Sequence, residues 1–325
     1  MRVLNARDVA ALLPMAEAID VVEAAMRRVS SGGAEMPLRQ VVPVGEGRIM
    51  GVMPGALDVP AAYGVKIVSI FADNPARGLS SHRGAVALFE AETGGCVAMI
   101  EAGLLTAIRT AAASAVASRA LARPGAERLV LIGHGEQAEH HLAAMRAVRP
   151  VTRVTVIGRD AARAAAFAER MRVHHPALVI ESGTDAEAAL RAADLVCTVT
   201  NSSTPVLHGD WLQPGQHVNA VGASVPTKRE LDDTAVLRSA VFCDFRASFF
   251  AQAGEIVDMT AAGRIGPEHL HAEIGEVLSG AAEGRRGDAD ITLYRSLGVA
   301  AQDLAVAHHV WRRAVADGRG IEAPF

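Results

Sequence analysis

The sequence predicts an α/β protein: an antiparallel sheet with a long helix comes first, and a doubly wound parallel sheet follows. From about residue 128, short apolar runs alternate with helical patterns, which is typical of a parallel sheet covered by helices. Before that point, strand-like runs follow one another directly and are separated by Gly, Pro, Asp and Asn. Half of the 325 residues are hydrophobic and only 4% are aromatic, so the core must be large and aliphatic.

The first part opens with an amphipathic helix, expected at residues 14–31, because Pro14 suits a first turn and Gly32-Gly33 stops the pattern. Five short strands are expected next, at residues 40–44, 48–53, 64–71, 85–90 and 96–100. An Ala-rich helix at about residues 104–122 then ends before Pro124-Gly125.

The second part alternates strands with helices. Strands are expected at residues 128–132, 154–157, 178–180, 195–199, 218–221 and 240–243, and helices at residues 137–148, 161–173 and 186–193. A final helix at residues 299–316 is long enough to pack back on the first part. Hinges are expected near residues 122–128 and 288–297.

Charge and composition exclude several classes of protein. The net charge of −4 argues against a nucleic-acid protein held by bulk basicity, and no apolar run reaches the roughly 18 residues of a membrane helix. Cys96, Cys197 and Cys243 are odd in number, widely spaced and set in apolar stretches, so we expect buried reduced thiols in a cytoplasmic protein. The twelve histidines lack metal-ligand spacing, and no metal is expected.

A glycine turn marks a dinucleotide site. Residues 129–138 (LVLIGHGEQA) form a predicted strand, a G-x-G-x-x-A turn and the start of a helix. Gly133 makes the tight turn, Gly135 lets backbone N–H groups approach a pyrophosphate, and Ala138 permits close helix–strand packing. The helix N-terminus adds partial positive charge for the phosphates.

The end of the next strand decides which dinucleotide binds. An acid at that place would bind the ribose 2′-hydroxyl and select NAD, but Gly158 and Arg159 stand there. Arg159 can pair with a 2′-phosphate, so the sequence favours NADP(H) over NAD(H). The alternative is a solvated arginine beside Asp160 as the cap of the next helix.

Three cations are candidates for holding a substrate carboxylate. Strand alternation places Lys66 on the same face as Val68 and Ile70, and a lysine buried near other cations has a lowered pKa and can carry a proton. Arg109 lies in the first turns of the Ala-rich helix, where the helix N-terminus would also attract an anion. Arg39 is the third cation. His82 is a possible pocket residue.

Five segments together resemble the ornithine cyclodeaminase and mu-crystallin family. They occur in this order: residues 64–66 (GVK), 105–112 (LTAIRTAA), 132–138 (IGHGEQA), 219–224 (NAVGAS) and 296–298 (SLG). The resemblance implies a Rossmann domain, residues 123–297, inserted in an α+β substrate-binding and dimerisation domain, residues 1–122 plus 298–325. It also implies a homodimer and hydride chemistry at the α-carbon of amino or imino acids.

The resemblance also implies roles for single residues. Arg39, Lys66 and Arg109 resemble ligands of the substrate carboxylate, and Leu297 a second contact with the substrate. The residues that resemble cofactor contacts, besides the glycine turn and Arg159, are Ser81, Arg109, Glu136, Gln137, Thr198, Val221, Lys228 and Ser296.

One departure from the cyclodeaminase pattern bears on the reaction. Ser224 stands where cyclodeaminases carry a catalytic aspartate, and the form G-A-S-x-P-x-x-R-E-L resembles mu-crystallin and the ketimine reductases. A serine without a base cannot deprotonate a distal ammonium, whereas ketimine reduction needs only a carboxylate clamp, a proton and a hydride. We therefore expect an NAD(P)H-dependent reductase of small cyclic imino acids, with Lys66 and Ser224 as candidate catalytic residues. The alternatives are ornithine cyclodeamination, an alanine dehydrogenase-like reaction, and a non-catalytic NADP-dependent binding protein.

Overall fold

The computed structural model describes residues 1–324, apart from the side chain of Pro75, and the chain forms two compact units. One unit comprises Met1–Ala112 and the C-terminal residues from Val299 onward, and the other comprises Ala113–Gly298. The first division falls inside helix α3 (Ala102–Leu121). The domain limits and roles stated above stay a prediction.

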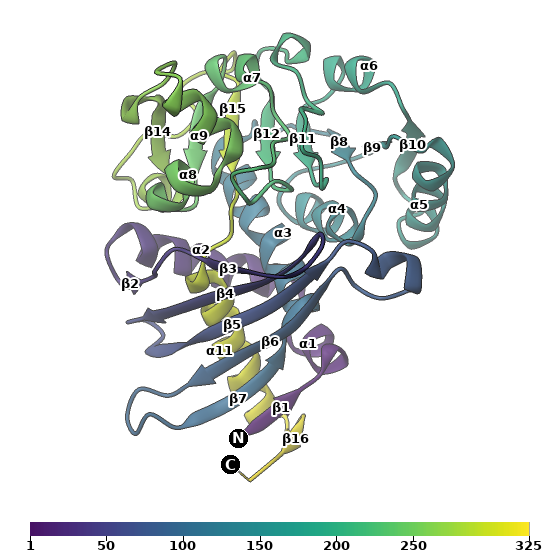
Figure 1. Ribbon diagram of the computed structural model, residues 1–325. Helices are drawn as coiled ribbons and strands as arrows, with labels where there is room; N and C mark the ends of the chain where they lie inside the picture. The colour runs from purple at the N-terminus through teal and green to yellow at the C-terminus, as the bar shows by residue number, and fades with distance from the viewer. Residues whose placement is uncertain (325) are drawn as a thin grey trace. The chain divides into compact units, whose positions relative to one another are not determined.

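The first unit is built on a mixed sheet with the strand order β16-β1-β7-β6-β5-β4-β2, in which β3 also pairs with β4. Its strands are β1 (Arg2–Leu4), β2 (Ala34–Glu35), β3 (Gln40–Gly45), β4 (Arg48–Leu57), β5 (Ala62–Phe71), β6 (His82–Phe89), β7 (Cys96–Glu101) and β16 (Ile321–Glu322). The pairs from β3 to β7 are antiparallel, as expected from the sequence, whereas β1 runs parallel to β7. Because β1 also pairs with β16, the two ends of the chain lie side by side (Figure 1).

Helices cover one face of this sheet. They are α1 (Ala6–Leu12), α2 (Met15–Ser30) and α11 (Ala300–Ala316). Helix α2 buries Ile19, Val22, Met26 and Val29, which recur every three or four residues and form its apolar stripe. Helix α11 crosses β4, β5 and β6 and packs against α2 (Figure 1). The sequence predicted α2 and α11 within a residue or two, but not the seven-residue α1, which has a capping box around Asn5.

The second unit is a doubly wound parallel sheet with the strand order β10-β9-β8-β11-β12-β15-β13-β14. Its strands are β8 (Arg128–Ile132), β9 (Arg153–Ile157), β10 (Val179–Gly183), β11 (Leu195–Thr198), β12 (His217–Ala220), β13 (Ala240–Cys243), β14 (Leu270–Glu273) and β15 (Thr292–Arg295). Its helices include α4 (Glu136–Val148), α5 (Ala161–His174), α6 (Ala186–Arg191), α7 (Asp233–Leu237), α8 (Arg246–Gln252), α9 (Gly254–Ala261) and α10 (Ile274–Leu278).

This topology fixes where a ligand can bind. The strand order reverses direction between β8 and β11, and ligands of doubly wound sheets bind at the carboxyl ends of the strands at such a point. The segment expected as a hinge, residues 288–297, contains β15, which lies between β12 and β13 inside the sheet, and the division between the two units falls directly after it, between Gly298 and Val299. Thr292 and Arg295 interrupt the apolar run of β15, so no strand was expected there from the sequence.

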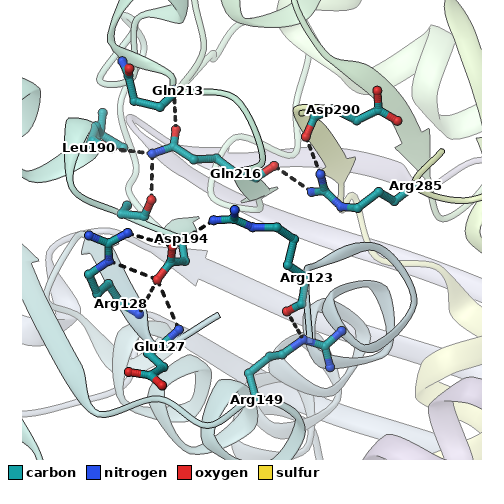
Figure 2. Close-up of polar contacts among 11 residues, drawn as sticks. Arg123, Glu127, Arg128, Arg149, Leu190, Asp194, Gln213, Gln216, Arg285 and Asp290 are labelled. Atoms are coloured by element: carbon teal, nitrogen blue, oxygen red, sulfur yellow. Dashed lines mark hydrogen bonds and ion pairs between the residues drawn. The ribbon is translucent and has the colours of Figure 1, made fainter. Parts of the chain in front are cut away.

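Arginines hold the start of the second unit together at the amino ends of its strands. Asp194 accepts hydrogen bonds from the side chains of Arg123 and Arg128 and from the backbone N–H of Glu127 (Figure 2). Arg149 donates to the carbonyl groups of Ser118, Arg119, Ala122 and Arg123, and thereby caps the C-terminus of α3.

No helix among residues 1–324 is long and apolar enough to cross a membrane.

Candidate functional site

Lys66 lies at the centre of a buried charge cluster in the first unit. Residues 62, 64, 66 and 68 of β5 are buried while Tyr63 and Ile67 are exposed, so Lys66 shares the helix-covered face with Val68, as the alternation predicted. Its side chain is 2% exposed, between Met53 on β4 and Val86 on β6. A Cβ atom added to Gly64 would lie 3.0 Å from Leu304 Cδ2, so this glycine lets α11 pack close to β5.

Asp303 on α11 joins Lys66 to Arg109. The Nζ of Lys66 lies 2.9 Å from Oδ1 and 2.8 Å from Oδ2 of Asp303. The Nε of Arg109 donates to the same Oδ1 at 2.8 Å, and its Nη1 donates to Gln302 Oε1 at 3.0 Å. Asp303 was not expected from the sequence, although an acid inside the Ala- and Val-rich helix of residues 299–316 was a signal for a buried ion pair.

The electrostatics of the cluster favour an anion. Burial, the charge of Arg109 and, less strongly, that of Arg39 together lower the pKa of Lys66 to about 7, against the opposing effect of Asp303. Burial alone would raise the pKa of Asp303, but Arg109 and Lys66 outweigh this and lower it. One amine and one guanidinium group therefore contact one carboxylate, and the second guanidinium group, that of Arg39, acts on Lys66, so positive charge is in excess.

Two N–H groups in the first turn of α3 are already used within the protein, and the expectation that this helix N-terminus helps to hold a carboxylate stays a prediction. The carboxylate of Glu101 accepts the N–H groups of Gly103 at 2.6 Å and Leu104 at 2.9 Å. In the loop before β6, Ser81 Oγ lies 2.9 Å from Nδ1 of His82, so these two predicted residues contact each other. Both belong to the first unit.

The glycine turn of the second unit has the geometry of a dinucleotide site. Gly133 follows β8 with a φ of +116°, and an added Cβ would lie 2.8 Å from the carbonyl oxygen of Val199, so only glycine fits. Gly135 is the N-cap of α4, and an added Cβ there would meet nothing within 4 Å. Within the described residues, the buried Gln137 Oε1 and Ser296 Oγ have no hydrogen-bond partner. The open helix N-terminus and these atoms fit a polar cofactor.

The end of β9 lacks an acid that could bind a ribose. Asp160 caps α5 and accepts the N–H of Arg163 at 3.0 Å, so its carboxylate is already used. Arg159 is exposed. A Cβ added to Gly158 would lie 2.6 Å from Cδ2 of His134, whose ring fills the space where a strand-end acid would project.

Glu230 holds the chain at the carboxyl ends of β11 and β12. It accepts hydrogen bonds from Thr198 Oγ1 at 2.8 Å, from the N–H and Oγ1 of Thr200 at 2.6 and 2.7 Å, and from the N–H of Gly222 at 2.6 Å. Burial raises the pKa of Glu230 despite these donors. The predicted cofactor residue Thr198 therefore turns its hydroxyl to Glu230. Lys228 hydrogen-bonds Asn201, and burial lowers its pKa.

Two more buried charges position Ser296 and Leu297. Arg295 pairs with Glu255 at 2.5 Å and donates to the carbonyl groups of Ala220, Ala223 and Ser296. Asp244 accepts the N–H groups of Leu297 at 2.7 Å and Gly298 at 2.6 Å. Glu230, Asp244 and Arg295 were not expected from the sequence as parts of a site. A charged residue within or directly after an apolar strand was the available signal for Asp244 and Arg295.

The other residues expected from the sequence are Val221, Glu136 and the three cysteines. Val221 directly follows β12 and is buried, while Glu136 is exposed in the first turn of α4. Cys197 and Cys243 are buried, and burial raises the pKa of the Cys197 thiol to about 12. Cys96 is only half-buried, contrary to expectation, because it is the first residue of β7 and lies where the strand begins. Among residues 1–324, no cluster of metal-ligating side chains occurs.

One family model matches nearly the whole chain and shows to which protein family it belongs. The model of the ornithine cyclodeaminase/mu-crystallin family matches residues 1–318. The chain belongs to this family. A family member from Bacillus cereus, a Delta(1)-pyrroline-2-carboxylate reductase, is 33% identical over 329 residues and covers 100% of both chains.

Solved structures of ornithine cyclodeaminase/mu-crystallin relatives agree over the whole length. The Thermococcus litoralis Delta(1)-pyrroline-2-carboxylate reductase, in complex with NADH and L-proline, has a TM-score of 0.95 at 32% identity and covers 99% of this chain and 100% of its own. An archaeal alanine dehydrogenase dimer with bound NAD has a TM-score of 0.93 at 33% identity, with 100% and 99% covered. The resemblance drawn from the five sequence segments is thus confirmed.

Proposed function

We propose that this chain is an NADPH-dependent reductase of small cyclic imino acids, such as pyrroline-2-carboxylate or piperideine-2-carboxylate. The observation that carries the proposal is the buried cluster in which Lys66 and Arg109 share the carboxylate of Asp303 while Arg39 adds positive charge that acts on Lys66. Such a cluster favours a small anion, and an amine with a pKa of about 7 can exchange a proton at neutral pH. Reductase relatives that cover the whole chain support the same class of reaction.

In this mechanism Arg39 and Arg109 bind the substrate carboxylate. Reduction of the C=N bond adds a hydride to the α-carbon and a proton to the nitrogen, and the bound cofactor supplies the hydride. The protonated Lys66 donates the proton to the imine nitrogen and is left as the neutral amine. Binding of a carboxylate beside Lys66 favours its protonated form, so the substrate itself prepares the acid.

The second unit would hold the cofactor. The open N-terminus of α4 behind Gly135 suits the pyrophosphate, and Arg159 suits a 2′-phosphate. Relatives have been solved with NADH and NAD, so the preference for NADP(H) rests on Arg159 and on the absence of a strand-end acid. The further proposed contacts are Ser81, Arg109, Glu136, Gln137, Thr198, Val221, Lys228 and Ser296.

Amino-acid dehydrogenation is the second candidate, because the archaeal alanine dehydrogenase is as similar in sequence as the reductases. Ornithine cyclodeamination is disfavoured by Ser224, since a hydroxyl cannot take the proton that an aspartate would take. In the reductase, Ser224 and Leu297 orient the substrate or the nicotinamide.

A turnover screen tests the proposal. Purified protein is given NADPH or NADH with pyrroline-2-carboxylate, piperideine-2-carboxylate, or pyruvate plus ammonia, and oxidation of the cofactor is followed. We expect the cyclic substrates with NADPH to be the fastest. Release of proline and ammonia from ornithine at a matching rate would restore cyclodeamination, and Ser224→Asp shows whether an acid at this position creates that activity. NADPH binding without any turnover would identify a binding protein.

A second copy of the chain would cover the face of the first sheet that α11 leaves bare. Ile67 is 43% exposed there and lies opposite Val52 and Ala85, while Tyr63 stacks on Phe89 at 5.5 Å. A flat apolar sheet face of this kind is typical of an interface, and the archaeal relative is a dimer. We expect Ile67→Arg to convert a dimer into a 33.9 kDa monomer in light scattering. A monomeric wild type would contradict the homodimer. Function in the cytoplasm also stays a prediction.

A further inference from the structure

We propose that Asp303 is a positioning residue, which orients Lys66 and Arg109 together and keeps a proton on the Lys66 amine until reduction consumes it. The inference rests on the proposed function, in which Lys66 is the proton donor. In this proposal Asp303 does not need to contact the substrate. It determines the protonation state of Lys66, which does contact the substrate.

Asp303 connects three elements through one oxygen atom. Its Oδ1 accepts from Nζ of Lys66 on β5 at 2.9 Å and from Nε of Arg109 on α3 at 2.8 Å, while Asp303 itself lies on α11. All three side chains are at most 5% exposed. Without the carboxylate, two cations would face each other in a buried space that water screens poorly, so they would repel each other.

The two cations depend on Asp303 to different degrees. Arg109 has a second anchor, because its Nη1 donates to Gln302 Oε1, and the Nε2 of Gln302 in turn contacts Met26 Sδ at 3.3 Å. Lys66 has, among residues 1–324, no hydrogen-bond partner other than Asp303. Loss of Asp303 should therefore displace Lys66 more than Arg109.

The charged groups around Lys66 act in opposite directions. Arg109 on α3 and Arg39 before β3 lower the pKa of Lys66, and Asp303 on α11 raises it; the neighbours on β4 and β6 are the apolar Met53 and Val86. Asp303→Asn should therefore move the titration of Lys66 to lower pH, and Arg39→Gln should move it to higher pH. If Asp303 only filled space in the cluster, its replacement by Asn would leave the titration of Lys66 unchanged.

The chain contains only two lysines, so the titration can be observed directly. Protein labelled with [13Cε]lysine gives one signal from Lys66 and one from Lys228. In the wild type we expect the Lys66 signal to titrate with a midpoint near 7. In Asp303→Asn the midpoint should fall by about one pH unit or more, while Lys228 serves as the internal reference. This experiment needs no substrate, so it stands even if the proposed reaction is wrong.

Gln302→Ala is the matched control, since Gln302 is the neighbouring buried side chain, also contacts Arg109, and is uncharged. It should leave the Lys66 midpoint unchanged. The same shift in Gln302→Ala, or no shift in Asp303→Asn, would overturn the inference.

The pH profile of the reaction is the second readout. The alkaline fall in kcat/KM should begin at lower pH in Asp303→Asn, while the affinity for NADPH stays the same. If Asp303→Asn does not fold, Asp303→Glu decides, because it keeps the charge but displaces both donors. We expect kcat to fall at least about tenfold with little change in the Lys66 midpoint, and an unchanged kcat would overturn the inference.

Discussion

Two buried carboxylates, Asp303 in the first unit and Glu230 in the second, are satisfied in different ways. Asp303 binds two cationic side chains, whereas Glu230 binds two backbone N–H groups and two threonine hydroxyls. The partners of Glu230 lie at the end of β11 or shortly after β11 and β12, so this acid fixes the path of the chain. The partners of Asp303 are side chains on regular elements, so this acid fixes reactive groups. Loss of Glu230 should cost mainly stability, and damage to the Asp303 cluster mainly activity.

Lys66→Met should have the largest effect on activity. Loss of a charge-assisted contact of roughly 2 to 3 kcal/mol reduces kcat/KM by about 30- to 150-fold, and loss of proton transfer adds about 100-fold. Fluorescence titration should show that NADPH still binds, because the glycine turn belongs to the other unit. Lys66→Arg should not restore activity, since a guanidinium group does not release its proton near neutral pH. Substantial activity in either variant would show that Lys66 is not the acid.

Glu230→Ala should have the largest effect on stability. Four donors would lose their acceptor inside the protein, which should lower the free energy of unfolding by about 3 kcal/mol or more. Urea denaturation measures this, and Glu187→Ala is the control, because Glu187 makes only a surface ion pair with Arg191 and should cost less than about 0.5 kcal/mol. Equal losses of stability in the two variants would remove the distinction between Glu230 and a surface acid.

The sequence predicted more of the fold than of the site. The β8 and β13 limits were predicted to the residue, because they are continuous apolar runs that end at glycine or a charge. Strand β15 was missed because Thr292 and Arg295 interrupt its apolar run, and helices α7 to α10 were missed because five to eight residues carry little helical periodicity. The local signals that these helices do carry are caps, such as Asp232 before α7 and the capping box of Glu273 and Glu276 at α10.

At the site, the cations were predictable and their partners were not. Lys66 and Arg109 were singled out by their apolar surroundings, and their convergence on Asp303 was not, because the acid lies 194 residues beyond Arg109 in the chain. Glu230 was part of a quoted motif but had no assigned role, since its partners are backbone groups, which have no signature in a sequence.

The end of β9 allows a test outside both buried clusters. Gly158→Asp introduces the acid that NAD-binding proteins use, but its side chain would collide with the ring of His134. Overpacking of this kind costs roughly 1 to 3 kcal/mol, so we expect roughly 5- to 150-fold weaker binding of NADPH and no gain for NADH. Replacing the ring as well, in His134→Ser with Gly158→Asp, should make NADH the better ligand. A gain for NADH in the single variant would show that His134 moves aside freely.

Arg159→Ala should have the smallest effect of the four, because this guanidinium is exposed and belongs to neither cluster. A solvated contact with a 2′-phosphate is worth about 1 kcal/mol, so the Kd for NADPH should rise only about five- to tenfold. The Kd for NADH should hardly change, since that cofactor lacks the phosphate. Added salt should weaken NADPH binding to the wild type and leave the variant less affected, because screening acts on exposed charges. Equal losses for both cofactors, measured by fluorescence titration, would place Arg159 away from the 2′-phosphate and withdraw the preference for NADP(H).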